Sequence, residues 1–144
     1  MNYKRLKEIL IRHEALKLKP YRCTEGKLTI GVGHNIDDNG ISEATAMFIL
    51  DEDIKNTEAE LRKFSWFEHL SDVRQEVLLN LHFNIGRSSF LQFKKMIRAL
   101  EMGDYLEAGE QMRDSKWFNQ VGIRAAQLVE AMQSDSFFSN HITG

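Results

Sequence analysis

The first side chain whose position in the sequence suggests chemistry is Glu14. It is followed directly by Ala15 and Leu16. A carboxyl group among apolar neighbours tends to have a raised pKa, and it can then donate a proton near neutral pH. Taken alone, a glutamate close to a helix end is more often a solvated surface residue. Glu14 by itself therefore indicates a candidate general acid and no more.

Two more reactive or hydrogen-bonding side chains follow Glu14 at short intervals. Eight residues separate Glu14 from Cys23, and five residues separate Cys23 from Thr29. A thiol has an ordinary pKa of about 8.5, so it is mostly neutral at pH 7 unless its surroundings lower that value. A lone cysteine is typically a small buried hydrophobic residue. A threonine hydroxyl both donates and accepts, so Thr29 could orient a water molecule.

A helix and a small β-hairpin must position these side chains. Helical spacing of mostly apolar residues predicts a short amphipathic helix over residues 3–13, marked by Leu6, Ile9, Leu10 and His13. Pro20 disfavours helix at the residue before it. Glycines and alternating apolar residues predict a β-hairpin over residues 21–34 with its turn at residues 24–27. Residues 37–40 are polar and predict a loop.

From Ser42 onward the pattern is helical. Ser42 suits the N-cap of a helix near residues 43–63, and Asp104 suits the cap of a later one. The other expected helices are marked by Val73, Val77, Leu78 and Leu81, by Phe90, Phe93, Ile97 and Leu100 before Gly103, and by residues 122–132. This order predicts an α+β fold in which a helix and a hairpin region precede a helical bundle, with a cleft between them.

Length and composition limit the possible functions. The 144 residues suit one domain, expected over residues 1–144 with a hairpin lobe near 14–41 and a helical lobe over 42–144. The net charge of -2 gives no basic field for nucleic-acid binding. Cys23 is the only cysteine, so neither an internal disulfide nor a thiolate metal site is expected, and a reducing compartment is favoured. The charged N-terminus predicts neither a signal peptide nor membrane insertion.

The spaced residues lie in a longer pattern that resembles a known family. Thr24-Glu25-Gly26 follows Cys23, and Thr29-Ile30-Gly31-Val32-Gly33-His34 begins at the third position of the spacing. This arrangement is similar to the T-even-type phage lysozymes (glycoside hydrolase family 24). Their pattern is Glu, eight residues, Asp or Cys, five residues, Thr, with T-I-G-x-G-H beginning at that threonine. The match is specific because the catalytic positions and the hairpin glycines coincide in one register.

A second match lies downstream. Trp117-Phe118-Asn119-Gln120, with Arg124 four residues later, resembles the W-x-N-Q-x-x-x-R segment of that family. The segment Leu81–Gly86 resembles the family's helix end that lines the cleft, so the resemblance covers roughly residues 3–130. It implies that Arg124 forms a supporting ion pair with Glu14. It also implies that six residues contact substrate: Glu25, Gly33, His34, Phe83, Asn84 and Gln120.

The resemblance implies a role for each spaced residue. Glu14 would protonate the departing glycosidic oxygen, while the group on the opposite face of the sugar assists the attack that an oxocarbenium-like transition state requires. Cys23 occupies that second position, where aspartate is the commoner residue. It would act as a base, act as a nucleophile or only position water, and these alternatives stay open. Thr29 would help to hold the attacking water.

Simpler structural interpretations remain for several of these residues. Arg124 also fits a surface helix, and Gly33 also fits hairpin geometry. His34 could pair with a carboxylate that links hairpin and bundle, or lie free at the surface. Trp117 fits the core of the bundle better than a sugar platform.

The resemblance implies a muramidase that hydrolyses the β-1,4 bond between N-acetylmuramic acid and N-acetylglucosamine. Its partner would be bacterial peptidoglycan, and it would use no cofactor and no metal. An endolysin of this kind would be made in the host cytoplasm, act as a monomer, and reach the wall through a holin pore to lyse the host. The alternatives are a non-catalytic wall-binding module that lost activity through Cys23, and a lytic transglycosylase.

Overall fold

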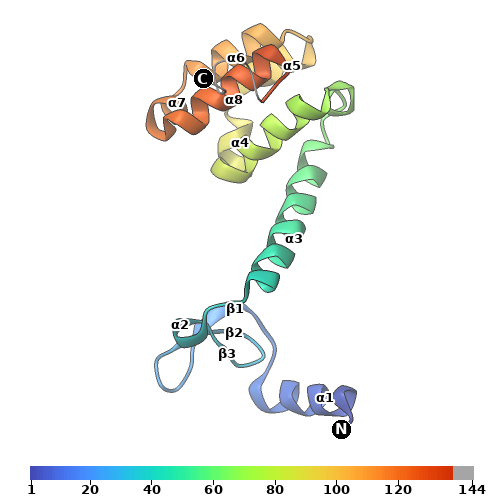
Figure 1. Cartoon of the computed structure of the whole chain (residues 1–144), viewed down its shortest axis with the longest axis vertical. Helices are drawn as coiled ribbons and strands as arrows, with labels where there is room; N and C mark the ends of the chain where they lie inside the picture. The colour runs from blue at the N-terminus through green and yellow to red at the C-terminus, as the bar shows by residue number, and fades with distance from the viewer. Residues whose placement is uncertain (138–144) are drawn as a thin grey trace. The chain divides into compact units, whose positions relative to one another are not determined.

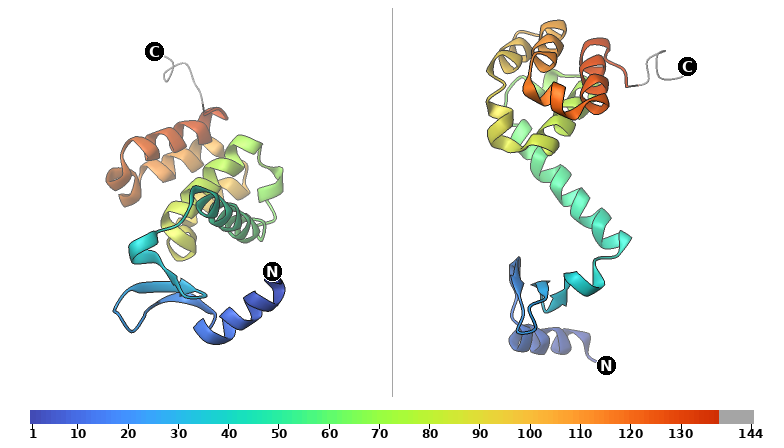
Figure 2. Two further views of the ribbon diagram at one scale, coloured as in Figure 1. Left: turned by 60° about the horizontal axis from the view of Figure 1, so that its bottom comes forward. Right: turned by 90° about the vertical axis from the view of Figure 1, so that its left-hand side faces the viewer.

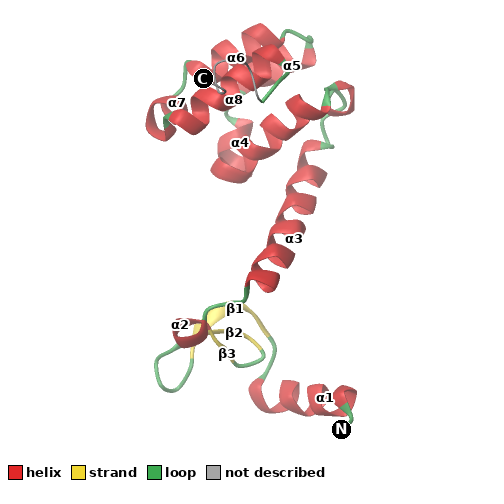
Figure 3. Ribbon diagram, viewed as in Figure 1, coloured by secondary structure: helices red, strands yellow, loops and turns green. Residues whose placement is uncertain are grey.

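The computed structural model describes residues 1–137 and divides into two compact units, Met1–Ile49 and Leu50–Gly144. Among the described residues there are eight α-helices and three strands. All three strands fall in one short stretch of the first unit, while helices make up the rest of the regular structure (Figure 3). The predicted α+β fold class is therefore confirmed.

The first helix, α1 (Tyr3–Glu14), confirms the prediction for residues 3–13 and continues to Glu14. It begins at a conventional cap, because the Asn2 side chain accepts a hydrogen bond from the Arg5 backbone N–H at 3.0 Å. It ends at Ala15, whose N–H donates to the Ile11 carbonyl at 2.8 Å while its backbone turns to φ 68° and ψ 156°. Glu14 is thus the last helical residue.

A three-stranded antiparallel sheet follows, with order β1-β2-β3. Its strands are β1 (Lys17–Arg22), β2 (Leu28–Gly31) and β3 (His34–Asn35). The β1–β2 pair confirms the predicted hairpin, although β1 begins earlier than expected. The register is irregular between Lys17 and Tyr21. Pro20 lies in this stretch of an edge strand, where a residue without an N–H is tolerated.

The polar segment after β3 is a single helical turn, α2 (Ile36–Asn39), which corrects the predicted loop. The Asn35 side chain caps this turn by accepting from the Asp38 N–H at 3.0 Å. Asp37 then accepts from the Leu28 backbone N–H at 2.6 Å and holds the turn on β2. The Asp-Asp-Asn sequence therefore starts a short helix because a capping residue precedes it.

Helices form the second unit. The helix α3 (Glu43–Leu61) crosses from the first unit into the second, with Ser42 at its N-terminus accepting from the Thr45 N–H as predicted. The helices that follow are α4 (Asp72–Leu91), α5 (Lys94–Glu101), α6 (Tyr105–Arg113), α7 (Lys116–Val121) and α8 (Ile123–Ser134), with a short 3-10 helix at Phe67–His69. Within this unit, α6 packs against both α5 and α8 (Figures 1 and 2).

Two predicted helix boundaries in this unit were wrong. Phe90 belongs to α4 rather than to the next helix, because the chain leaves helical geometry at Phe93 before α5 begins. The short helix α7 was not predicted separately, and it is divided from α8 by Gly122. The helix α4 also kinks at Gly86, where φ is 82° and ψ is 168°. The predicted helix end at Gly86 corresponds to this kink.

The second unit has a continuous apolar core. Its largest fully buried side chains include Phe67, Phe90, Leu78, Leu81, Met96, Met112 and Met132. Burial of each such side chain stabilises a fold by roughly 1.5–3 kcal/mol. One core-facing residue is polar: the ring of His82 lies 5.0 Å from the Phe90 ring, centroid to centroid.

Arg74 joins α4 to the C-terminal end of α8. Its Nε donates to the Met132 carbonyl at 2.7 Å and its Nη2 donates to the Gln133 carbonyl at 3.3 Å. A cation at these carbonyls satisfies groups that have no partner within the helix.

Candidate active site

Glu14 is positioned by the C-terminal end of α1. The helix stops at this residue, and the Glu14 side chain reaches the backbone of Gly33 in the turn between β2 and β3. The two segments are 19 positions apart in the sequence, and both belong to the first unit. The structure therefore brings the predicted acid to the hairpin that carries the other predicted catalytic residues.

Cys23 begins the turn between β1 and β2. Its N–H donates to the Lys27 carbonyl at 2.9 Å, and its carbonyl accepts from the Gly26 N–H at 2.8 Å. The pKa of the Cys23 thiol is lowered, first by a hydrogen bond from the Lys27 backbone N–H, then by one from the Glu25 N–H, and to a smaller extent by the Thr29 hydroxyl. Partial desolvation and the negative charge of Glu25 oppose this shift. The turn thus stabilises the thiolate relative to that of an ordinary cysteine, so the thiol loses its proton at a lower pH.

Thr29 lies on β2 beside the thiol and is buried, with 3% of its surface exposed. Its hydroxyl donates to the Lys27 carbonyl at 2.9 Å and also interacts with the Cys23 sulfur. A hydroxyl has one proton, so a bond donated to a thiolate competes with the bond to Lys27. Cys23 and Thr29 therefore form a pair in which the hydroxyl can donate its hydrogen bond to a charged sulfur instead of to the Lys27 carbonyl.

Three predicted substrate contacts lie in the same unit: Gly33, which lies beside the Glu14 side chain, Glu25 and His34. Glu25 is in the Cys23 turn, where its N–H and its charge act on the thiol in opposite directions. The Nε2 atom of His34 lies 2.6 Å from the Gly40 carbonyl oxygen, so its ring pairs with the backbone beyond α2 rather than with a carboxylate in this unit. Contact of any of these three residues with substrate stays a prediction.

The remaining predicted residues lie in the second unit. Asn84 on α4 accepts a hydrogen bond from Nε1 of Trp117 at 2.8 Å. Trp117 is buried and meets the Phe93 ring edge-on, which confirms its place in the bundle core. Gln120 follows on α7, one turn beyond Trp117. Asn84 therefore has a structural role in joining α4 to α7, whatever it does toward a ligand.

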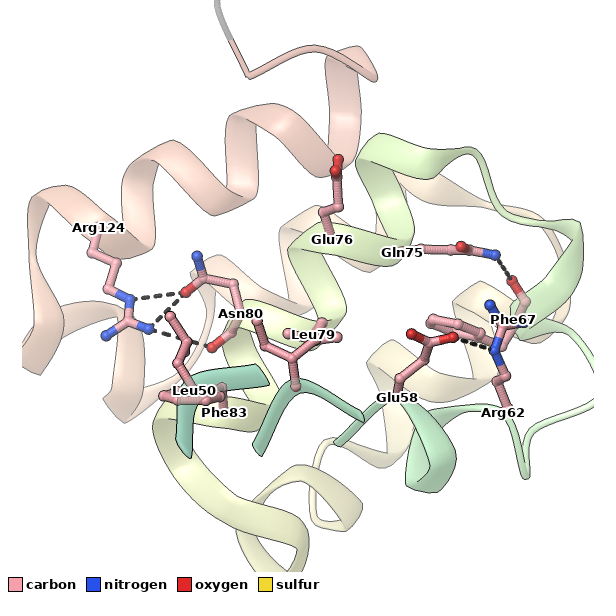
Figure 4. A pocket seen from close by; sticks show the side chains of 11 residues that line it. Leu50, Glu58, Arg62, Phe67, Gln75, Glu76, Leu79, Asn80, Phe83 and Arg124 are labelled. Atoms are coloured by element: carbon pink, nitrogen blue, oxygen red, sulfur yellow. Dashed lines mark hydrogen bonds and ion pairs between the residues drawn. The ribbon is translucent and has the colours of Figure 1, made fainter. Parts of the chain in front are cut away.

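Arg124 lies on α8 beside a groove of the second unit. Its Nε and Nη2 donate to Asn80 Oδ1 at 2.9 and 2.7 Å, so Asn80 orients the guanidinium (Figure 4). The groove also has an ion pair between Arg62 and Glu58 at 2.6 Å. Its apolar lining includes Leu50, Ile54, Leu79 and Phe83. Asn80 was not predicted, although it stands one helical turn before Asn84 and therefore shares a face of α4 with it.

No group of three or more His, Cys, Asp or Glu side chains within residues 1–137 is placed to hold a metal ion. In the same part of the chain, no helix is long and apolar enough to cross a bilayer. His141, one of the five histidines, lies outside the described residues.

Comparison with known proteins adds sequence relationships to this geometry. Residues 11–134 match the family described as Phage lysozyme. The chain is 24% identical to "Probable T4-type lysozyme 1" of Dictyostelium discoideum, an alignment that covers 90% of this chain and 94% of that protein. It is 33% identical to "Endolysin" of Acyrthosiphon pisum secondary endosymbiont phage 1, covering 76% and 74% of the two chains. It is also 33% identical to "Endolysin" of Salmonella phage P22, covering 70% and 73%.

Proposed function

Because this chain belongs to the phage lysozyme family, we propose that it cleaves the β-1,4 bond between N-acetylmuramic acid and N-acetylglucosamine with Glu14 as the acid. It is a glycosidase that hydrolyses peptidoglycan, as the family match and the endolysin relatives show. The observation that carries the proposed residue roles is one arrangement in the first unit: Glu14 ends α1 against the same hairpin that holds the Cys23–Thr29 pair.

In the proposed reaction, Glu14 gives its proton to the glycosidic oxygen as the bond from that oxygen to the anomeric carbon breaks. Water attacks the anomeric carbon, and Thr29 helps to orient that water. A Cys23 thiolate either takes the proton of the water as a base or attacks carbon first as a nucleophile. The lowered thiol pKa supports these two ionised roles over a role in which neutral Cys23 only positions water.

The substrate contacts are part of the same proposal. Six residues are proposed to contact glycan or peptide: Glu25, Gly33, His34, Phe83, Asn84 and Gln120. Arg124, which donates to Asn80, is proposed to form a supporting ion pair with Glu14. No cofactor is proposed, and activity that survives exhaustive chelation would be consistent with this.

The decisive variant is Glu14→Gln, which keeps the shape of the side chain and removes its acidic proton. General acid catalysis contributes roughly a hundred- to ten-thousand-fold, so clearing of purified cell walls is expected to fall by at least a hundredfold. Glu8→Gln makes the same change on the same helix and serves as the matched control, with clearing expected near wild type. A folded Glu14→Gln protein that clears walls normally would refute the assignment.

The products separate this proposal from its alternatives. Hydrolysis leaves reducing muramic acid ends, whereas a lytic transglycosylase leaves anhydro-muramic ends. Mass spectrometry of the released muropeptides distinguishes the two. A non-catalytic wall-binding module would bind purified walls and release no fragments.

The cellular setting is likewise proposed. The relatives named endolysins suggest that the protein is made in the host cytoplasm and lyses the host from within, passing the inner membrane through a holin pore. Expression in bacteria with and without a co-expressed holin tests this route, with rapid lysis expected only when the holin is present. We propose a monomer because Glu14, Cys23 and Thr29 lie in one unit of one chain. Light scattering tests the monomer.

A further inference from the structure

Gly33 lies where a side chain would meet the carboxyl group of Glu14. A Cβ atom built on Gly33 would stand 2.8 Å from Glu14 Oε2, 3.0 Å from Cδ and 3.1 Å from Cγ. Contacts shorter than about 3.0 Å lie inside the carbon–carbon distance of roughly 3.5–4.0 Å at which van der Waals attraction is greatest. The missing side chain of Gly33 is therefore what leaves room for Glu14 in its present position.

Gly31 provides a comparison within the same hairpin. Its φ of 71° is close to the 67° of Gly33, so both positions favour glycine for backbone reasons alone. A Cβ on Gly31, however, would meet no atom within 4 Å. The backbone explains glycine at both positions, and the contact with Glu14 is an additional constraint at Gly33 alone.

The backbone of Glu14 is constrained as well. Ala15 has φ 68° and ψ 156°, a region that is populated almost only by glycine and costs other residues about 1–3 kcal/mol. Its N–H remains bonded to the Ile11 carbonyl at 2.8 Å. Glu14 is thus fixed at its main chain by the end of α1, and the far end of its side chain stops at Gly33.

We propose that Gly33 is a positioning residue. Because it has no side chain, the Glu14 carboxyl group can lie directly against its backbone, and this contact sets the position of the carboxyl group. This inference rests on the proposed function of Glu14 as the acid. A methyl group at residue 33 is most easily accommodated by movement of the flexible carboxyl group, so the fold survives while the acid is displaced. A misplacement of about 1 Å can cost a reaction about a hundredfold in rate.

The test compares Gly33→Ala with Gly31→Ala on soluble glycan oligomers, with rates expressed per folded molecule. Both variants carry the strain of alanine at positive φ, so similar losses in Tm are expected. Gly33→Ala is expected to lose at least tenfold in kcat, with KM changed less than about twofold. Gly31→Ala is expected to stay within about twofold of wild type. Equal kcat values for the two variants, or a defect of Gly33→Ala in KM alone, would overturn the proposal.

A second measurement needs no activity. The side-chain carboxyl carbon of Glu14, assigned by NMR from its disappearance in Glu14→Gln, is expected to shift in Gly33→Ala and to stay in place in Gly31→Ala. An unmoved resonance in Gly33→Ala counts against the contact. If Gly33→Ala folds poorly, adding Glu14→Ala is expected to restore its Tm to that of Gly31→Ala, and failure to do so also overturns the proposal.

These outcomes are distinct from failure of the proposed function. If wild type releases no fragments from walls, or Glu14→Gln releases them normally, the function of Glu14 is wrong even when the resonance moves. If wild type is active, Glu14→Gln is inactive and the two alanine variants are equal, only the role of Gly33 is wrong.

Discussion

At the scale of single residues, the site is built by backbone groups as much as by side chains. The Cys23 thiol faces the backbone N–H groups of Lys27 and Glu25, and the Glu14 carboxyl meets the bare backbone of Gly33. Backbone groups in a tight turn are fixed by the fold, so they favour charge at a defined place without the entropy cost of ordering a long side chain.

Ionisation of Cys23 should determine how activity rises with pH on the low-pH side of the pH–activity profile. The hydrogen bonds from the Lys27 and Glu25 N–H groups lower the pKa of the Cys23 thiol below its ordinary value, so activity should begin to rise at a lower pH than an ordinary thiol would allow. Cys23→Asp should keep substantial lysis and shift the profile to lower pH, because aspartate ionises at about 3.9.

Cys23→Ser is the contrasting variant, since a hydroxyl can position water but does not ionise near neutrality. We expect it to lose most of the lysis, measured as wall clearing between pH 4 and pH 9. Wild-type clearing by Cys23→Ser over that whole range would remove any ionic or nucleophilic role for Cys23 and would make Glu25 the next candidate.

Ala15 should be a source of instability that one substitution removes. Ala15→Gly relieves the strain of φ 68° and loses part of the gain to the greater freedom of glycine in the unfolded chain, so a net stabilisation of about 1 kcal/mol is expected. Ala126→Gly makes the same chemical change inside α8 and should destabilise by about 1 kcal/mol. Denaturant unfolding measures both, and a destabilised Ala15→Gly protein would contradict the prediction.

At the scale of elements, local sequence was a good guide where a cap and an apolar stripe agreed. The helices α1 and α3 were predicted to within two residues at each end, because Tyr3–Glu14 and Glu43–Leu61 begin at suitable caps and carry apolar periodicity. The turn α2 was missed because its residues are those of a polar loop. The turn is held by hydrogen bonds from the Asp38 N–H to Asn35 and from the Leu28 N–H to Asp37, and the second of these joins segments apart in the sequence.

The helix boundaries and site contacts that were not predicted depend on tertiary contacts, which the spacing of residues in the sequence does not indicate. Phe90 has the same spacing to Phe93 and Ile97 as residues of one helix, yet the chain bends between them to bury Phe90 with α4. The candidate site likewise has one part that the sequence predicts and another that only the structure shows. The motif identified Glu14, Cys23 and Thr29, whereas the contact of Glu14 with Gly33 and the bond of Asn80 to Arg124 join segments far apart in the sequence.

The hydrogen bond from Trp117 on α7 to Asn84 on α4 allows a structural role of Asn84 to be tested apart from a role in substrate binding. Asn84→Ala removes the acceptor of the Trp117 indole N–H and should lower the free energy of unfolding by about 1 kcal/mol. Asn84→Asp keeps an acceptor oxygen and should stay close to wild type in stability. Thermal unfolding followed by tryptophan fluorescence measures both. Unchanged stability in Asn84→Ala, with weaker binding to purified walls, would assign Asn84 to substrate alone.

At the scale of the whole molecule, the well-packed core belongs to the second unit and the predicted catalytic residues belong to the first. Both tryptophans, Trp66 and Trp117, are buried in the second unit, so their fluorescence reports on that unit alone. Stability of the core and activity of the site can therefore be followed by independent signals.

His82 should make the second unit sensitive to acid. Burial lowers the pKa of His82 below its ordinary value of 6.5, while its own carbonyl and the charge of Glu60 oppose the shift and Arg87 adds to it. The folded state then binds fewer protons than the unfolded state. The contribution of neutral His82 to the free energy of unfolding is fully present above about pH 6.5. It is lost as the pH falls through the lower pKa that His82 has in the folded state.

The measurement is denaturant unfolding by tryptophan fluorescence at pH 7.5 and pH 5. Wild type should be less stable at the lower pH, and His82→Phe should lose much of that difference because phenylalanine fills the site beside Phe90 without titrating. His69→Phe changes an exposed histidine and is the matched control. An equal pH effect in wild type and His82→Phe would show that other groups cause it.

The turn that lowers the pKa of the Cys23 thiol also makes that sulfur more open to oxidation. A thiolate reacts with peroxide to a sulfenic acid, and further oxidation to the sulfinic acid is irreversible. Cys23 is the only cysteine, so a sulfenic acid formed there has no second thiol within the chain to return it through a disulfide. Enzyme kept in air would thus lose activity permanently, while enzyme kept with a small thiol would not, and an aspartate at the same position would need no such protection.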